Sequence, residues 1–304
     1  MRVSMCAAGQ MYGAAVGPME TRKQARARIG LLGPMRLHAE DAEKQVSVAP
    51  KIRTVLAMLG MHPDQVVPVS TLTRELWPEQ PPVTALRTLQ TYIFNIRKAL
   101  AGITELTAED VADQLLVTQD NGYRLHSSDL RLDWLDFMQL ADQGRHALAD
   151  GDSHTGIQEL EQALGMWRGS VLTDVPAGAV LEARRLMLEE SRLDTIEALI
   201  DARIEAGLHQ QVIAELASLT SEHPYHEGLH AQYMRALALN GRRAAALEVF
   251  VRLRTRLIDE IGIEPGYPLQ QLQTTILNSH KSAYTDLALG TTGNPNEVRG
   301  HRQL

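Results

Sequence analysis

Apolar residues between residues 84 and 100 recur at spacings of three and four, the period of an amphipathic α-helix. These apolar positions are Leu86, Leu89, Ile93, Ile96 and Leu100. The opposite face carries basic, hydroxyl and amide side chains, which are Arg87, Thr88, Thr91, Asn95 and Lys98. Gln90 and Arg97 lie at the edges of this face. The pattern predicts a helix over residues 84–100 with one buried and one polar face.

Shorter elements precede this helix. Residues 28–38 have the pattern of two strands interrupted at Gly33-Pro34, and residues 45–48 that of a third short strand. Pro50 suits the start of a helix, because its missing N–H has no helical partner to lose. That helix should run to about Met61 and bury Ile52, Val55, Leu56 and Leu59.

A second short helix should follow an extended piece at residues 66–69. Ser70 is the expected N-cap of this helix, because Ser side chains accept hydrogen bonds from the first turn. Pro78 ends the helix, and a Pro-rich loop leads into residue 84.

Residues 115–119 and 122–126 flank Asp120-Asn121 and predict a β-hairpin, since Asn-Gly supplies the positive φ of such turns. The order is strands, helix, helix, loop, longer helix and hairpin. It predicts a winged helix-turn-helix over residues 28–126. In that fold the third helix enters the major groove, and the hairpin lies over the backbone or minor groove.

From residue 129 onward the pattern is almost entirely helical. Segments 151–164, 207–219 and 241–253 each begin with Gly after one helix and continue into another. The offset from Gly207 to Gly241 is 34 residues, the tetratricopeptide period. We therefore expect a mainly α protein. The α+β winged helix is followed over residues 127–280 by an all-α, tetratricopeptide-like array with a concave surface for protein partners. Residues 1–27 and 281–304 are expected to be disordered tails.

Charge is distributed unevenly along the 304 residues, whose net charge is −7. Residues 127–280 hold 13 basic and 23 acidic residues, whereas residues 28–126 hold ten and eleven. No acidic residue occurs from Gln80 to Thr104. DNA binding must therefore depend on a local patch, and the helix over residues 84–100 is the best candidate.

Several classes of protein are disfavoured. No apolar run approaches the length of a membrane span, and the N-terminus has no signal-peptide pattern. Cys6 is the one cysteine, so an intrachain disulfide is impossible. A phosphate-binding Gly-rich loop is absent. We expect a cytoplasmic, nucleoid-associated protein without enzymatic activity, cofactor or membrane partner.

The segment His226-Glu227-Gly228-Leu229-His230 matches H-E-x-x-H, a zinc metalloprotease signature. The extended form of that signature needs Gly and His where Tyr233 and Ala236 stand. The segment also lies in a helix that the repeat needs for packing. We expect no metal site, and a zinc hydrolase is kept as a rival function.

Stretches spread over residues 28–280 resemble the Streptomyces antibiotic regulatory protein family. The resemblance runs through LLGPMRL, APKIRTVLAMLGMHP, VVPVSTLTRELWPEQPP, ALRTLQTYIFNIRKAL, NGYRL, DWLDFMQLADQGRHALADGD, ALGMWRGSVLTDVP and EHPYHEGLHAQYMRALALNGRRAAALEVFVRLRTRLIDEIGIEPG. It implies an OmpR-type winged helix followed by a bacterial transcriptional activator domain. It further implies an activator that binds direct repeats at promoters of biosynthetic clusters and recruits RNA polymerase holoenzyme, without enzymatic activity.

The resemblance also implies roles for residues of the third helix. Phosphate contacts fall on Arg87, Thr88 and Arg97, and base-facing positions on Gln90, Thr91 and Asn95. Lys98 is a further expected phosphate contact.

Two positions depart from the family pattern. Members usually have a small or polar residue where Phe94 stands, and Arg where Asn95 stands. Asn prefers adenine whereas Arg prefers guanine, so the operator should differ from those of relatives.

Three other regions complete the expected interface. Lys51 and Arg53 could touch phosphates, although Arg53 is equally well explained as a solvated charge. OmpR-type hairpins often have Arg where Gln119 stands, so Asn121 or Arg124 would contact the backbone instead. The resemblance implies that the polymerase would meet the loop after the second helix: Trp77, Pro78, Glu79, Gln80, Pro81 and Pro82. Trp77 is also explained as a core residue, as are Trp134 and Trp167.

Together these features predict a DNA-binding transcriptional activator of a secondary-metabolite gene cluster, acting as a homodimer on DNA. The alternative is a protein-binding scaffold whose winged helix binds no DNA, and the near-neutral N-terminal domain is its best support.

Overall fold

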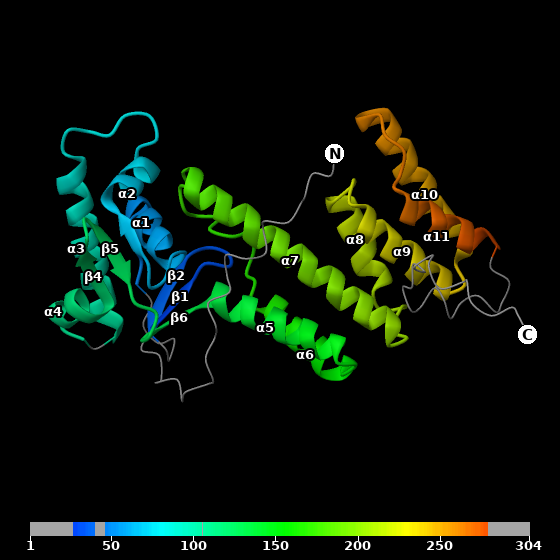
Figure 1. Cartoon of the computed structure of the whole chain (residues 1–304), viewed down its shortest axis with the longest axis horizontal. Helices are drawn as coiled ribbons and strands as arrows, with labels where there is room; N and C mark the ends of the chain where they lie inside the picture. The colour runs from blue at the N-terminus through cyan, green and yellow to red at the C-terminus, as the bar shows by residue number, and fades with distance from the viewer. Residues whose placement is uncertain (1–26, 40–45, 105, 279–304) are drawn as a thin grey trace, which may run out of the picture. The chain divides into compact units, whose positions relative to one another are not determined.

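The computed structural model describes residues 27–39, 46–104 and 106–278 (Figure 1). The predicted tails lie outside these residues, apart from Ala27. The chain forms two compact units, each assembled from separate segments. Of the described residues, the first contains 27–30, 35–39, 46–104, 106–132 and 174–181, and the second contains 31–34, 133–173 and 182–278.

The first unit opens with a three-stranded sheet of order β2-β1-β6. Strand β1 (Ala27–Gly30) is antiparallel to β2 (Arg36–Ala39) and parallel to β6 (Leu130–Leu132). The predicted strand over residues 45–48 is wrong for residues 46–48. Val46 donates a single hydrogen bond to the Leu37 carbonyl, and the helix at Pro50 begins before a ladder can form.

A second sheet of order β3-β5-β4 contains the predicted hairpin. Its strands are β3 (Val66–Pro68), β4 (Leu116–Gln119) and β5 (Gly122–Leu125). Asp120 and Asn121 have φ values of 46° and 58°, so both turn residues adopt the left-handed conformation of a tight hairpin. Gly122 is required at the next position, because a Cβ there would meet the Val67 carbonyl oxygen at 2.6 Å.

Three helices pack together in this unit: α1 (Pro50–Gly60), α2 (Val69–Leu76) and α3 (Ala85–Thr104). The predicted core positions of α1 are confirmed, since all four are 8% exposed or less. The predicted N-cap of α2 is wrong, because the cap residue is Pro68 and not Ser70. Strand β3 ends directly at the helix, and the Asn121 carbonyl accepts the Val69 N–H at 3.1 Å.

A connector joins α3 to β4. It contains a short helix α4 (Ala108–Asp110) and a π-helical turn η1 (Val111–Leu115). Thr107 and Asp110 form a reciprocal capping box at the start of α4.

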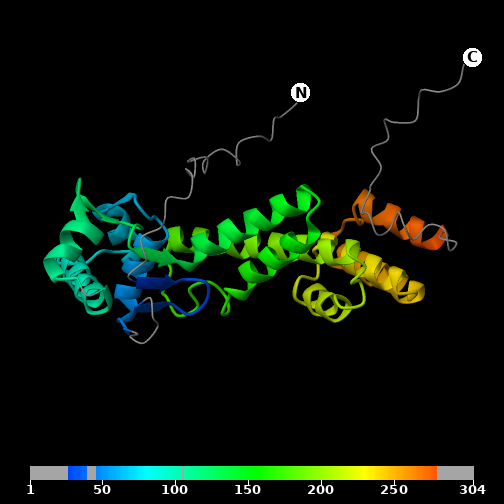
Figure 2. The ribbon, with the colours of Figure 1, turned by 90° about the horizontal axis from the view of Figure 1, so that it is seen from below.

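All the regular elements among the described residues of the second unit are helices. Its helices are α5 (Asp133–Ala149), α6 (Ser153–Gly165), most of α7 (Ala179–Glu205), α8 (Ile213–Glu222), α9 (Glu227–Leu239), α10 (Arg243–Arg256), the π turn η2 (Leu257–Ile261) and α11 (Tyr267–Asn278). Helices α9, α10 and α11 pack on one another around a common apolar cluster (Figure 2).

The three repeat glycines end helices in the same way. Gly151, Gly207 and Gly241 have φ values of 85°, 80° and 76°. The residue after each glycine donates its N–H to a carbonyl in the last turn of the preceding helix, which is the Schellman arrangement. The predicted helix-Gly-helix units are therefore present, although α8 begins only at Ile213.

Aromatic residues fill the α5 region of the second unit. The rings of Phe137 and Trp167 meet edge to face with centroids 5.2 Å apart, and Trp134 is 5% exposed. The Arg192 guanidinium lies over the Trp167 ring at 4.7 Å. The packing roles expected for both tryptophans agree with these positions.

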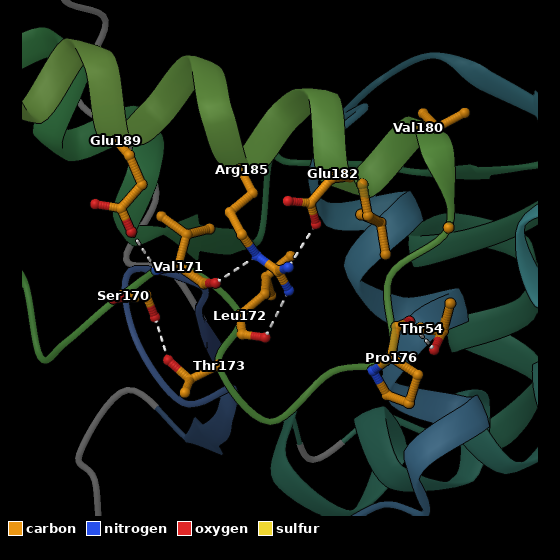
Figure 3. A network of polar contacts seen from close by, with 12 residues as sticks. Thr54, Ser170, Val171, Leu172, Thr173, Pro176, Val180, Glu182, Arg185 and Glu189 are labelled. Atoms are coloured by element: carbon orange, nitrogen blue, oxygen red, sulfur yellow. Dashed lines mark hydrogen bonds and ion pairs between the residues drawn. The ribbon is translucent and has the colours of Figure 1, made fainter. Parts of the chain in front are cut away.

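Within the second unit, Arg185 fixes the segment before α7 (Figure 3). Its guanidinium donates to the carbonyls of Val171 and Leu172 at 3.0 and 3.1 Å and pairs with Glu182. Glu189 accepts the Val171 N–H at 2.8 Å. One helix face therefore satisfies several backbone groups of an irregular segment.

Within the first unit, residues 174–181 are held by the helices of the winged domain. Thr54 donates its hydroxyl to the Pro176 carbonyl at 2.9 Å (Figure 3). The Glu75 carboxylate, from α2, accepts the N–H groups of Gly178, Val180 and Leu181 at 2.7 to 3.0 Å. Glu75 is only 5% exposed, so it neutralises the positive end of α7 in a site that excludes water.

We expect Glu75→Ala to destabilise the protein by about 2–4 kcal/mol, because three N–H groups lose a charged acceptor. Urea unfolding measures the change. Glu75→Gln keeps one acceptor oxygen and should lose less. Glu79→Ala, which removes an exposed carboxylate, is the control and should leave stability unchanged. Equal stability of Glu75→Ala and the parent protein would contradict this role.

Candidate nucleic-acid interface

The rotation of α3 is fixed by its apolar row. Leu89, Ile93, Ile96 and Leu100 are 2% exposed or less and face the interior of the first unit. Leu86, predicted to join this row, is 53% exposed, so that prediction is wrong. It lies in the first turn of α3, directly after the exposed stretch Pro78–Thr84, where no other element covers it.

The outward face of α3 gathers most of the predicted contact residues. Each exposed side chain on this face has another one three or four positions away: Arg87, Gln90, Thr91, Phe94 and Lys98. Thr88 and Asn95 are half-buried beside them. The helix contains no acidic residue, so this face carries two cations without a competing carboxylate on the same helix.

Arg97 is turned toward the hairpin. Its Nε and Nη2 atoms donate to the Leu116 carbonyl at 3.0 and 2.8 Å, and Nη2 also donates to Thr118 Oγ1 at 2.9 Å. Burial lowers the pKa of Arg97, although the charges of Tyr123 and Asp113 oppose that effect. Burial likewise raises the pKa of Tyr123, while Arg97 lowers it. Arg97 therefore connects α3 to β4.

The hairpin offers fewer polar groups than α3. Asn121 is exposed at the turn, next to the exposed carboxylate of Asp120. Arg124 is half-buried on β5, opposite Val66 and Val117 of the neighbouring strands. Its Nε atom is buried and has no hydrogen-bond partner in the described part of the chain.

The two basic residues of α1 are engaged within the first unit. The Lys51 ammonium lies over the Trp77 ring, 5.1 Å from its centroid. Arg53 pairs with Asp174 at 2.5 Å and donates to the Val48 carbonyl at 2.9 Å. Trp77 is half-buried, whereas residues 78–82 are exposed.

The H-E-x-x-H side chains each have contacts elsewhere. His226 caps α9 by accepting the Leu229 N–H, and Glu227 accepts the Gly266 N–H at 2.7 Å. His230 is 6% exposed, and burial lowers its pKa despite a hydrogen bond to the His226 carbonyl. Among the described residues, no group of three or more His, Cys, Asp or Glu side chains could hold a metal ion.

Comparison with known proteins gives two family matches. Residues 43–125 match the model "Transcriptional regulatory protein, C terminal", and residues 132–277 match the bacterial transcriptional activator domain. Regulatory protein DnrI of Streptomyces peucetius is 38% identical over 252 residues, covering 83% of this chain and 92% of that protein. The chain belongs to the Streptomyces antibiotic regulatory protein family.

Two further regulatory proteins and one solved structure are also similar to this chain. Transcriptional regulatory protein EmbR of Mycobacterium tuberculosis is 36% identical over 268 residues, covering 86% of this chain and 68% of that protein. Regulatory protein AfsR of Streptomyces coelicolor is 33% identical over 263 residues, which is 25% of its length. A solved structure of Mycobacterium tuberculosis EmbR in complex with a low affinity phosphopeptide matches with a TM-score of 0.77 and 35% identity. The match covers 87% of this chain and 70% of the EmbR chain in that structure.

These matches confirm the family and the fold predicted from sequence. A Streptomyces antibiotic regulatory protein is a DNA-binding transcriptional regulator, and the matched relatives are named as regulators rather than as enzymes. Every helix in the described residues is too short or too polar to be a membrane span.

We expect Arg97→Ala to lower the stability of the first unit by about 1–2 kcal/mol, because the Leu116 carbonyl loses its donor. Lys98→Ala, its exposed neighbour, should leave stability unchanged. Thermal unfolding of both variants without DNA measures the difference. If both variants unfold like the parent protein, Arg97 has no structural role.

Proposed function

We propose that the chain is a sequence-specific activator of a secondary-metabolite gene cluster that binds direct repeats at promoters as a homodimer and recruits RNA polymerase. The outward face of α3 carries this proposal. It presents Arg87 and Lys98 with amide and hydroxyl groups, on a helix without acids, in a chain of net charge −7. The nucleoid of the cytoplasm is the corresponding location.

Phosphates would be bound by Arg87, Thr88 and Lys98. Arg87 and Lys98 lie at opposite ends of the exposed row, so they can meet the DNA backbone on either side of a groove. Asn121 and Arg124 would contact the backbone from the hairpin. We assign Arg97 to positioning the hairpin against α3, because its guanidinium already binds β4.

We assign Lys51 and Arg53 to contacts within the first unit. Their charges are held by the Trp77 ring and by Asp174. A phosphate would have to displace those contacts, so we place α1 outside the first set of DNA contacts.

Bases would be read by Gln90, Thr91 and Asn95. Amide side chains can form paired hydrogen bonds with adenine N6 and N7 in the major groove. The Thr91 hydroxyl donates to the Arg87 carbonyl at 3.0 Å, which leaves its lone pairs available to a base amino group.

The polymerase would meet the loop from Trp77 to Pro82. Residues 78–82 are exposed between α2 and α3, so they stay accessible while α3 lies in the groove. The helical array, whose charge repels DNA, would provide protein contacts for the dimer or the polymerase.

A scaffold with a winged helix that binds no DNA is the second candidate. Its support is the near balance of ten basic and eleven acidic residues in residues 28–126. A gel shift with DNA upstream of the native cluster, titrated with salt, separates the candidates. DNA binding that weakens with salt supports the activator, and no binding at low salt supports the scaffold.

We expect Arg87→Ala to weaken binding to operator and random DNA by the same factor and to reduce the salt slope by about 1, because one phosphate contact is lost. Fluorescence anisotropy over a salt series measures both quantities. Arg74→Ala removes an exposed charge of α2 and is the control. An unchanged salt slope for Arg87→Ala would remove Arg87 from the phosphate contacts.

Asn95→Ala should cost about 1–3 kcal/mol of binding free energy on the operator and little on random DNA. The same anisotropy assay compares the two DNAs. Equal losses on both would mean that Asn95 reads no base.

A further inference from the structure

We propose that Phe94 is a specificity-determining residue whose ring contacts the 5-methyl group of thymine in the operator. This inference rests on the proposed function, because it needs α3 to lie in a major groove. It adds a base type that the polar residues of α3 do not specify.

Phe94 occupies an unusual position for its residue type. It is 64% exposed on a helix whose inward positions are already filled by apolar residues such as Ile93 and Ile96. The other two phenylalanines, Phe137 and Phe250, are 0% and 4% exposed. Exposing a large apolar ring to water is unfavourable, so a partner that covers it would recover that free energy.

The surroundings of Phe94 indicate which partner this is. Gln90 and Lys98 lie one turn away on either side, and Arg87 and Thr91 share the exposed face. An apolar partner protein would meet cations and amides around a single ring. A DNA groove offers anionic phosphates for the cations at both ends and base edges for the centre.

Only thymine suits a phenyl ring among the major-groove edges. A phenyl ring neither donates nor accepts conventional hydrogen bonds, so it cannot satisfy guanine O6 and N7 or the cytosine amino group. Thymine presents a methyl group, against which an apolar side chain packs. The neighbouring amides Gln90 and Asn95 favour adenine, so this face would select A·T base pairs.

The test uses the full chain and an operator selected by the protein from random DNA. Each thymine is replaced in turn by deoxyuridine, which keeps every hydrogen bond and lacks only the methyl group. We expect one thymine per half-site at which deoxyuridine weakens binding roughly fourfold, the value of one buried methyl group. Phe94→Ala should bind thymine and deoxyuridine operators equally.

Two variants control for folding and for apolarity alone. Phe94→Leu keeps an apolar side chain and should retain part of the deoxyuridine effect. Leu86→Ala removes the other exposed apolar side chain of α3, which lies on the flank of the face, and should retain the full effect.

The outcomes separate the two proposals. If the protein selects and binds no DNA, the proposed function fails. If it binds an operator but deoxyuridine has no effect at any position, the function stands and the thymine contact is overturned. Loss of dimerisation in Phe94→Ala, measured by light scattering without DNA, combined with an unchanged deoxyuridine effect, would assign Phe94 to a protein interface and overturn the inference.

Discussion

Burial of one row of α3 determines what the protein can present to DNA. Leu89, Ile93, Ile96 and Leu100 are almost completely removed from water, and this fixes the rotation of the helix about its axis. Once one face of a helix is buried, the residues on the opposite face are determined by the helical period. Arg87, Gln90 and Lys98 are therefore exposed on the opposite side.

Much of the fold follows from local rules that the sequence carries directly. The period of α1 and α3, the existence of the hairpin and the repeat glycines were all predictable, because each depends on neighbouring residues. The positive φ values of the turn fall on Asp120 and Asn121, and not on Gly122 as predicted. The predictions of secondary structure fail where contacts with segments distant in the sequence determine the element. Strand β6 forms beside β1, and α2 starts at Val69, where Asn121 of the hairpin turn supplies an acceptor for its first N–H.

The candidate interface divides in the same way. The polar face of α3 could be predicted from spacing, since helix geometry alone places residues three and four apart together. The contacts of Arg97 and Arg53 could not, because their acceptors come from β4 and from residue 174. Leu86 is exposed because no other element among the described residues covers it. Hydrophobic periodicity gives the face of a helix on which a residue lies, but not whether another element covers that face.

Each unit includes a short segment from a part of the sequence that otherwise belongs to the other unit, and this limits how the protein can be divided into fragments. Residues 174–181 belong to the first unit, and residues 31–34 to the second. A fragment that stops at residue 126 would lack both β6 and the N–H groups that Glu75 accepts. The Glu75 carboxylate would then lack its donors, and one edge of β1 would be unpaired. No single cut therefore releases an intact DNA-binding unit.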